Sequence, residues 1–479
     1  MINSDFRDPD DSDNRSFEVH PTIYPSVELE YPNSGASEKF ALLVPKDKDH
    51  YNPIMCLENT LHTIYKHYLT PIQQSWFGTL PSSNLADDDI PGPASLTEAA
   101  LEASTALFPP PSALSVASSP ASSSSDSSTD SSSSASSNSS ATSITSVSSV
   151  SSIASLSSIT NLSHHAIQIS PTAAPTVNYL RLLQRAINKR DGPLFIKVME
   201  AINALLRLLK YPPLPPDPFE SPPPNCFPDV VKSWTNIPKE VVTRIVDETY
   251  QRAVGPHVAE LKRYEAFSSE VYGELMPALV SQIINETGLG PDSLFVDLGS
   301  GVGNVVLQAS LQTGCKSFGI EIMPTPAKIA RSQLEQIRIR CRMWGVKMGE
   351  VELEEGDMLT SRKVDELVPQ ADVVLVNNKV FLEPLNEALR PKFLDLKEGA
   401  IVVSLKPFVS SSRLTERNLD DISAIFQVKE RPYYAGSVSW GNGGGSYYFH
   451  RVDREGYADI KKRFENSRTT PARTTRSRR

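Results

Sequence analysis

The nonapeptide VDLGSGVGN, residues 296–304, constrains the fold more than any other stretch of this chain. The apolar stretch SLFVDLG leads into three glycines at every second position, and the helix-like stretch NVVLQASLQTG follows. Glycine adopts left-handed backbone angles and lets a ligand approach the main chain closely. The order strand, glycine loop, helix is typical of an α/β sheet that binds its ligand at the carboxyl ends of the strands.

The same alternation continues beyond this unit. CKSFGIEI, ADVVLVNN, GAIVVSL and SYYFHRV read as further strands. Between the first two, apolar residues recur at steps of 4, 3, 4 and 3, which is one face of a helix: Ala330, Leu334, Ile337, Cys341 and Trp344. Strands that alternate with helices predict a mostly parallel, doubly wound α/β sheet, which we place at residues 226–455.

The other half of the chain has a different composition. Between residues 111 and 160, 27 of 50 residues are serine, so this stretch cannot bury enough apolar surface to fold. Eight prolines in residues 212–224 predict an extended spacer. We expect the following organisation: residues 1–16 disordered, a small element at 17–85, a disordered Ser-rich linker at 86–175, a helical segment with the Pro-rich spacer at 176–225, and a basic tail at 456–479.

Two N-terminal stretches leave alternatives open. Residues 17–85 contain strand-like and helix-like pieces, and they form either a small domain or a docking element. Residues 194–209 place six apolar side chains on one helical face, which favours core packing over a partner-binding helix.

Charge and cysteine content exclude several classes of protein. The net charge is −9, but residues 461–479 carry eight basic residues and one acid, a local charge of +7. That tail is either a solvated segment or an arm for phosphate binding or nuclear import.

The four cysteines are far apart, which argues against a disulfide framework or a zinc site. No signal peptide and no apolar run long enough for a membrane span are recognised.

Acidic residues around the glycine loop indicate its ligand. A dinucleotide fingerprint needs a sixth-position glycine, but Asn304 stands there. Asp297 ends the first strand, where a carboxylate repels a pyrophosphate and attracts a cationic amino group. Glu321 ends the second strand, where an acid typically holds ribose hydroxyls. An ammonium-bearing nucleoside satisfies both, so we predict S-adenosyl-L-methionine as the cofactor, with Asp357 and Met358 beside its adenine.

Six stretches in order resemble one family. They are YEAFSSEVYGEL (264–275), FVDLGSGVGN (295–304), SFGIEI (317–322), VNNKVF (376–381), LKPF (405–408), and GSVSW with SYYFHRVDR (436–454). Together they are similar to the disruptor-of-telomeric-silencing (DOT) family, the non-SET histone H3 lysine-79 N-methyltransferases, of fungal type. The resemblance implies a class I methyltransferase fold, Rossmann-like, preceded by a small helical subdomain and the disordered linker.

The resemblance also implies which residues form the site. A narrow channel for the acceptor lysine would involve Phe267, Asn377, Trp440 and Tyr447, although residue type alone predicts core packing for the three aromatic side chains. The implied cofactor-binding residues are Val271, Tyr272, Gly273, Glu274, Phe295, Val296, Asp297, Leu298, Gly299, Ser300, Gly301, Val302, Gly303, Asn304, Glu321, Asp357 and Met358. The chain departs from the family pattern at Lys379, where an aromatic residue is frequent, and at Met358, where phenylalanine is usual.

The implied activity is methyl transfer from S-adenosyl-L-methionine to lysine-79 of histone H3 in nucleosomes, in the nucleus, with roles in chromatin silencing and the DNA damage response. Implied partners are the nucleosome, including ubiquitinated histone H2B, and nucleosomal DNA through the basic tail 461–479. Two alternatives stay open. One is a methyltransferase for another protein or a small molecule, and the other is a non-catalytic chromatin scaffold.

Overall fold

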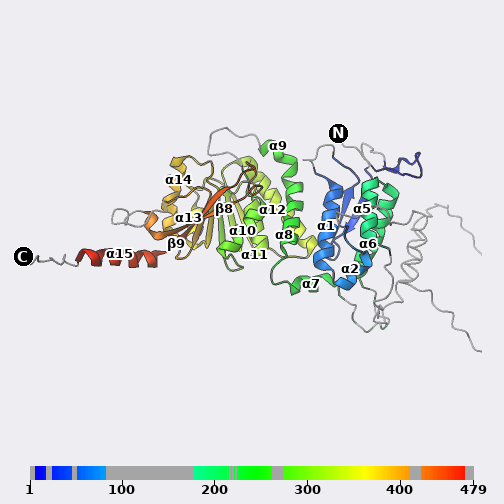
Figure 1. Cartoon of the computed structure of the whole chain (residues 1–479), viewed down its shortest axis with the longest axis horizontal. Coiled ribbons are helices and arrows are strands. Elements are labelled where there is room, and N and C mark those ends of the chain that lie inside the picture. Colours follow the sequence, from blue (N-terminus) through cyan, green and yellow to red (C-terminus); the bar gives the residue numbers. More distant parts are fainter. Residues whose placement is uncertain are drawn as a thin grey trace, which may run out of the picture.

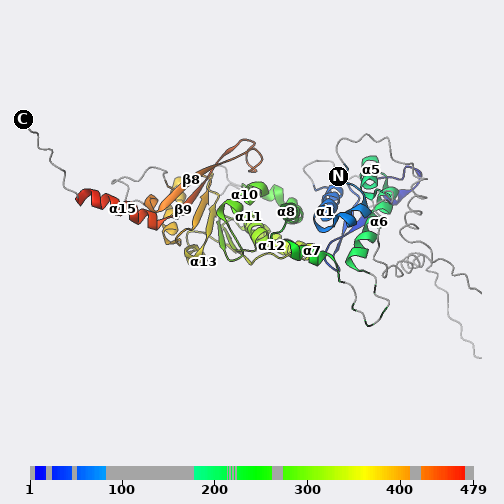
Figure 2. The ribbon, with the colours of Figure 1, turned by 60° about the horizontal axis from the view of Figure 1, so that its bottom comes forward.

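The structure is a computed structural model that describes residues 6–17, 24–45, 51–81, 177–261, 273–409 and 422–469, without residues 213, 215, 216, 218, 220, 222 and 223. The Ser-rich linker, Phe267, Val271, Tyr272 and residues 470–479 lie outside this range. Residues 6–81 and 177–233, as far as they are described, are called the N-terminal module below. This module and the C-terminal helix lie at opposite ends of the described molecule in two views (Figures 1 and 2).

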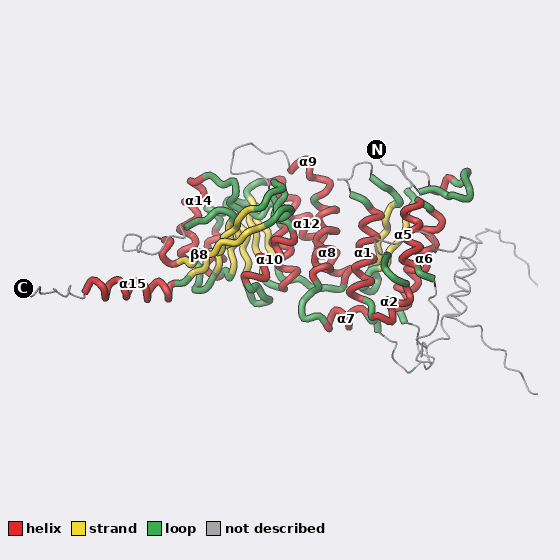
Figure 3. Tube along the Cα trace, in the orientation of Figure 1, coloured by secondary structure: helices red, strands yellow, loops and turns green. Residues whose placement is uncertain are grey.

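A seven-stranded sheet forms the centre of the C-terminal half (Figure 3). In spatial order its strands are β5 (Val351–Glu355), β4 (Lys316–Glu321), β3 (Leu294–Leu298), β6 (Val373–Val376), β7 (Ile401–Ser404), β9 (Gly445–Val452) and β8 (Phe426–Tyr433). The first five strands are parallel, and β9 runs antiparallel to both of its neighbours. The strand order reverses at β3, which makes its carboxyl end the switch point where such sheets bind ligands. The expected mostly parallel α/β sheet is confirmed.

Helices cover both faces of this sheet because alternate strand residues point to opposite sides. Phe295 of β3 packs with the core beneath α10, α11 and α12, whereas Val296 packs with the core beneath α13 and α14. On the first side lie α10 (Pro277–Thr287), α11 (Asn304–Thr313) and α12 (Pro324–Trp344). On the second side lie α13 (Arg362–Leu367), η5 (Val368–Gln370), α14 (Glu383–Leu389) and η6 (Arg390–Asp395). The expected helical face on α12 is confirmed, since Ala330, Ile337, Cys341 and Trp344 are buried.

The N-terminal module is a small α/β unit. Its elements are η1 (Arg15–Phe17), β1 (Ser26–Glu30), β2 (Ser37–Ala41), α1 (Pro53–Tyr68), α2 (Pro71–Phe77), α5 (Tyr179–Lys189), α6 (Gly192–Lys210) and α7 (Phe227–Ser233). The strands β1 and β2 form an antiparallel hairpin. The apolar face of α6 is a core face, as expected, because Phe195, Ile202 and Leu206 are buried. The stretches 17–81 and 177–225 thus share one core.

Helix α8 (Lys239–Ala253) joins this module to the sheet, packing on both α1 and α12. Glu248 of α8 is fully buried and accepts hydrogen bonds from Tyr31 at 3.1 Å, Thr60 at 2.5 Å and Trp344 Nε1 at 3.0 Å. Nearby, the two terminal guanidinium nitrogens of Arg340 donate to the Glu38 carboxylate, at 2.6 and 3.0 Å. These contacts join residues up to about 300 positions apart, so the module is built into the rest of the fold.

The expectation that residues 1–16 are disordered differs from the structure for residues 6–16. Phe6 is buried with its ring 5.2 Å from that of Phe195, and Phe17 packs over Gly192. The main chain of Arg7 pairs with residues 190 and 192. Two aromatic side chains therefore anchor an otherwise acidic segment to α6.

The remaining elements are η4 (Gly255–His257), α9 (Val258–Leu261), η7 (Ile422–Ile425) and α15 (Arg454–Thr469). Helix α15 projects from the body of the molecule (Figure 1) and contains the described part of the basic tail. Across the described ranges, none of the helices combines the length and apolar character that crossing a membrane requires.

Candidate functional site

A cavity of about 180 Å³ lies at the carboxyl ends of β3, β4 and β6. Many of the predicted site residues line it: Gly273, Glu274, Asp297, Gly299, Ser300, Gly301, Val302, Asn304, Glu321, Asp357, Met358 and Asn377. Other predicted residues do not line it, namely Phe295, Val296, Leu298, Gly303, Trp440 and Tyr447. Of these, Phe295, Val296 and Leu298 are buried strand residues whose side chains belong to the two cores.

The glycine loop adopts the conformation that its sequence predicts. Gly299, Gly301 and Gly303 have φ angles of +90°, +56° and +84°, which side-chain-bearing residues rarely adopt. The amide of Gly301 donates to Glu321 Oε2 at 2.8 Å. Glu321 thus ties the loop to the end of β4 while it lines the cavity.

Gln333 of α12 supports the loop from behind. Its amide nitrogen donates to the carbonyl of Val302 at 2.7 Å and to Asn304 Oδ1 at 2.9 Å. The sequence analysis missed this residue, because a glutamine inside an amphipathic helix carries no local signal of such a contact.

Asp297 is a buried carboxyl group of the cavity with a strongly raised pKa. It is 2% exposed, and no described residue donates a hydrogen bond to its carboxyl group. Burial, with a smaller contribution from the neighbouring Glu321 carboxylate, raises its pKa from 3.8 to about 8. The ionised form of this carboxyl group would therefore be stabilised by a cationic hydrogen-bond donor placed beside it.

The side chain of Asn377 contains a second polar atom without a hydrogen-bond partner among the described residues. Its Nδ2 donates to the carbonyl of Gly273 at 3.1 Å, whereas its buried Oδ1 has no hydrogen-bond partner among the described residues. Buried amide oxygens are rarely left unpaired, so this atom is a candidate acceptor for a ligand.

The opposite wall of the cavity is apolar. The Met358 Cε and Phe381 Cζ atoms lie 3.8 and 3.7 Å from the point where a Cβ on Gly299 would stand. Asp357 Oδ1 accepts the backbone amide of Leu359 at 2.8 Å, which fixes this turn. Phe381 was not predicted individually, although it belongs to the VNNKVF motif that signalled the site.

A short backbone pairing brings the Gly-rich hairpin loop to the cavity mouth. Leu275 forms an antiparallel bridge with Val438, and the backbone amide of Ser439 donates to the carbonyl of Glu274 at 3.0 Å. A Cβ on Gly273 would lie 2.6 Å from Cε3 of Trp440, so only glycine fits beneath this indole. Trp440 is 38% exposed and stands beside the cavity rather than in its lining.

Tyr447 in β9 lies in the core, as its residue type alone predicts. It is fully buried, and its hydroxyl donates to Glu286 Oε1 at 3.2 Å. Arg431 holds the other oxygen of Glu286 at 2.8 Å. Burial and the Glu286 carboxylate raise the pKa of Tyr447. A part for Tyr447 in an acceptor channel stays a prediction, as does the part of Phe267, which is not described.

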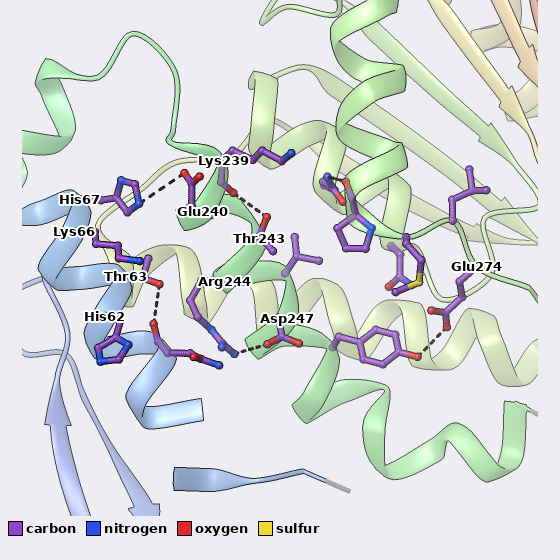
Figure 4. Close-up of a pocket in the computed structure, with 18 of the residues that line it drawn as sticks. His62, Thr63, Lys66, His67, Lys239, Glu240, Thr243, Arg244, Asp247 and Glu274 are labelled. Atoms are coloured by element: carbon purple, nitrogen blue, oxygen red, sulfur yellow. Dashed lines mark hydrogen bonds and ion pairs between the residues drawn. The ribbon is translucent and has the colours of Figure 1, made fainter. Parts of the chain in front are cut away.

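A larger cleft of about 800 Å³ adjoins the cavity (Figure 4). It runs between α1 and α8 to the start of α10 and shares Glu274, Leu275 and Asn304 with the cavity lining. Its walls carry charges of both signs, some of them paired, as in Arg244 with Asp247 at 2.7 Å. Tyr250 of α8, which the sequence analysis missed, donates to Glu274 Oε1 at 3.0 Å.

No three described His, Cys, Asp or Glu side chains converge as metal ligands, and all four cysteines are free.

Comparison with known proteins agrees with these motifs. Residues 250–452 match the family described as "Histone methylation protein DOT1". Proteins named "Histone-lysine N-methyltransferase, H3 lysine-79 specific" from Mycosarcoma maydis and Cryptococcus neoformans are each 37% identical, over 90% and 91% of this chain. These alignments cover 60% and 63% of the relatives, so the chain spans about three fifths of the curated relatives it matches. A protein of the same name from Emericella nidulans is 45% identical over 44% of this chain and 42% of its own length.

Solved structures are more distant. An RNA methyltransferase from Salinibacter ruber, in complex with S-adenosyl-L-homocysteine, is 21% identical with a TM-score of 0.27, over 38% of this chain and 94% of its own. In sequence, residues 250–452 of this chain are therefore similar to the DOT1 family of histone methylation proteins.

Proposed function

We propose that this chain is an S-adenosyl-L-methionine-dependent protein-lysine N-methyltransferase that acts on lysine-79 of histone H3. The observation that carries the proposal is the Asp297 carboxyl group, which is buried beside a left-handed glycine loop with no donor from the described residues. The names of the fungal relatives supply the acceptor.

The residues present fit this cofactor. Asp297 would pair with the ammonium of its methionine part, and the glycine loop leaves the backbone open to it. Glu321 would accept from ribose hydroxyls. Met358 and Phe381 offer apolar surface to a purine, and Asp357 lies next to them to accept from its amino group. When bound, S-adenosyl-L-methionine supplies an electrophilic methyl group on a positively charged sulfur.

The protein's task is then to deliver a neutral lysine amine in line with that methyl group. A lysine ammonium has no lone pair, and deprotonation at pH 7 costs about 5 kcal/mol from a pKa of about 10.4. An apolar approach disfavours the charged form, so the proton can leave to solvent before transfer. In this proposal Trp440, which stands beside the cavity, would exclude water, and the unpaired Oδ1 of Asn377 would orient a donor group. Positioning accounts for the remaining acceleration.

The adjoining cleft favours a macromolecular acceptor over a small molecule. It has about four times the volume of the cavity, and both signs of charge line it, as a polypeptide surface requires. The unpaired Asp297 carboxyl and Asn377 oxygen argue against a scaffold that binds no ligand in this cavity, whereas a scaffold that binds the cofactor without turnover is left to the test below.

The cellular setting follows from the acceptor. We infer that the enzyme acts in the nucleus on nucleosomes, and that nucleosomal DNA is held by the basic tail 461–479, whose first residues extend from the body on α15. Dependence on ubiquitinated histone H2B and roles in silencing and the DNA damage response are part of the same proposal.

Radiolabelled methyl transfer tests the proposal directly. Free histones and intact nucleosomes are offered in parallel, with Gly301→Arg as the inactive control because it blocks the loop and strains its backbone. Label on lysine-79 of histone H3, in nucleosomes, is the expected result. Cofactor binding without label on any histone would overturn it in favour of another acceptor or the scaffold.

A further inference from the structure

Asn378 follows Asn377 directly but points elsewhere. It is 1% exposed and does not line the cavity. Its Nδ2 donates to Asn386 Oδ1 and to the carbonyl of Lys406, both at 3.1 Å. Its Oδ1 accepts the backbone amides of Leu405 at 3.0 Å and Lys406 at 2.8 Å. The side chain thus makes four hydrogen bonds, which is the usual capacity of an amide.

These side-chain bonds connect the two segments beyond the point where their strands stop pairing. The parallel pairing of β6 with β7 ends at Val376 and Ser404, so the residues that follow each strand are no longer paired with each other in the sheet. The backbone amide of Asn378 donates to the carbonyl of Val376 at 2.9 Å. The backbone carbonyl of Asn378 accepts from the backbone amide of Phe381 at 3.3 Å. The Asn378 side chain therefore braces a tight turn, residues 376–381, against the segment that follows β7.

The same turn carries the groups that face the cavity. Asn377 reaches Gly273 and leaves its Oδ1 unpaired, while Phe381 covers Gly299. We propose that Asn378 is a positioning residue, which holds the turn so that Asn377 points into the cavity. This inference rests on the proposed function, because it assigns a purpose to the orientation of Asn377.

A double-mutant cycle separates positioning from stability. Asn378→Asp keeps the size of the side chain but removes both N–H donors, so that the turn loses its bonds to Asn386 Oδ1 and to the carbonyl of Lys406. If Asn378 acts through Asn377, then Asn378→Asp should reduce kcat/KM on nucleosomes about tenfold or more, as Asn377→Ala does. The double variant should fall no more than about threefold below Asn377→Ala, because coupled residues are not additive.

Ser404→Ala is the matched control. Ser404 is fully buried, and its hydroxyl donates to the same Lys406 carbonyl at 2.7 Å. It meets the turn only through its backbone, in register with Val376. It should lower the Tm as Asn378→Asp does and keep kcat/KM near that of the wild type. Losses that multiply in the double variant, or an Asn377→Ala variant with wild-type activity, would overturn the inference.

Two further readouts keep the test decisive. If Asn378→Asp does not fold, Asn386→Ala removes one of the four bonds and enters the same cycle, with an expected loss of about threefold that again does not add to Asn377→Ala. The cycle is repeated for cofactor Kd by calorimetry. A wild-type chain that methylates no histone refutes the proposed function. If the wild type is active but the losses of the two single variants multiply in the double variant, only the role of Asn378 is refuted.

Discussion

Binding of S-adenosyl-L-methionine should release a proton from Asp297. Each pKa unit is worth 1.36 kcal/mol, so raising the pKa from 3.8 to about 8 means that the ionised carboxylate costs the folded chain about 6 kcal/mol without a cationic partner. The folded state holds this proton more tightly than the unfolded state. The contribution of Asp297 to stability is therefore greatest below about pH 4 and is lost as the pH rises toward 8.

An ammonium group placed against Asp297 reverses that preference. At pH 6.5 the free carboxyl is almost fully protonated and the amino group of the cofactor, with a pKa of about 8, is almost fully charged. Pairing them should release about one proton for each cofactor bound. At pH 9 Asp297 is already ionised, and proton uptake by the cofactor's amino group should replace the release.

Calorimetry in two buffers of different ionisation enthalpy measures this proton count. Asp297→Asn is the matched control, because it keeps the shape and cannot release a proton. We expect that variant to show no release at pH 6.5, to bind the cofactor more weakly, and to unfold at a higher temperature at pH 8 when the cofactor is absent. A wild-type chain that releases no proton at pH 6.5 would refute the pairing of Asp297 with the cofactor.

Three other perturbations address parts of the molecule away from Asp297. Gly273→Ala brings a Cβ 2.6 Å from Trp440, so we expect about a tenfold higher KM for nucleosomes, from roughly 1–3 kcal/mol of overpacking; an unchanged KM would contradict this contact. Glu248→Ala leaves Arg340 and its neighbours without their buried carboxylate and should cost about 3–5 kcal/mol of unfolding free energy in urea titrations, whereas Ile72→Ala on the surface should cost little. Deletion of residues 461–479, with local charge +7, should weaken nucleosome methylation, flatten its salt dependence and spare cofactor Kd; equal activity at moderate salt would sink the tail's proposed role.

Local sequence patterns were sufficient to predict the secondary structure around the glycine loop and the acidic residues beside it. The strand, glycine loop and helix at 294–313 could be placed because left-handed glycines and apolar periodicity are written within a dozen residues. Asp297 and Glu321 could be nominated because each ends a recognisable strand. The same reasoning failed for residues 6–16, where composition indicated disorder and two aromatic anchors decided otherwise.

Side-chain partners distant in sequence could not be predicted this way. Nothing near Gln333 shows that it holds the loop 31 residues earlier, and nothing near Asn378 shows that it meets the end of β7. The sequence could not say whether Tyr447 packs or lines a channel, because both uses suit an aromatic residue on a strand.

The sequence by itself determined the α/β class, the ligand edge of the sheet and the acidic residues that line the cavity, since these follow from short-range periodicity and backbone preferences. Only the tertiary structure decided that the N-terminal module is built onto α8 and α12, that Asp297 lacks a donor among the described residues, and that Asn377 leaves an oxygen unpaired. Burial and hydrogen-bond satisfaction depend on which distant segments meet, and that is a property of the whole fold.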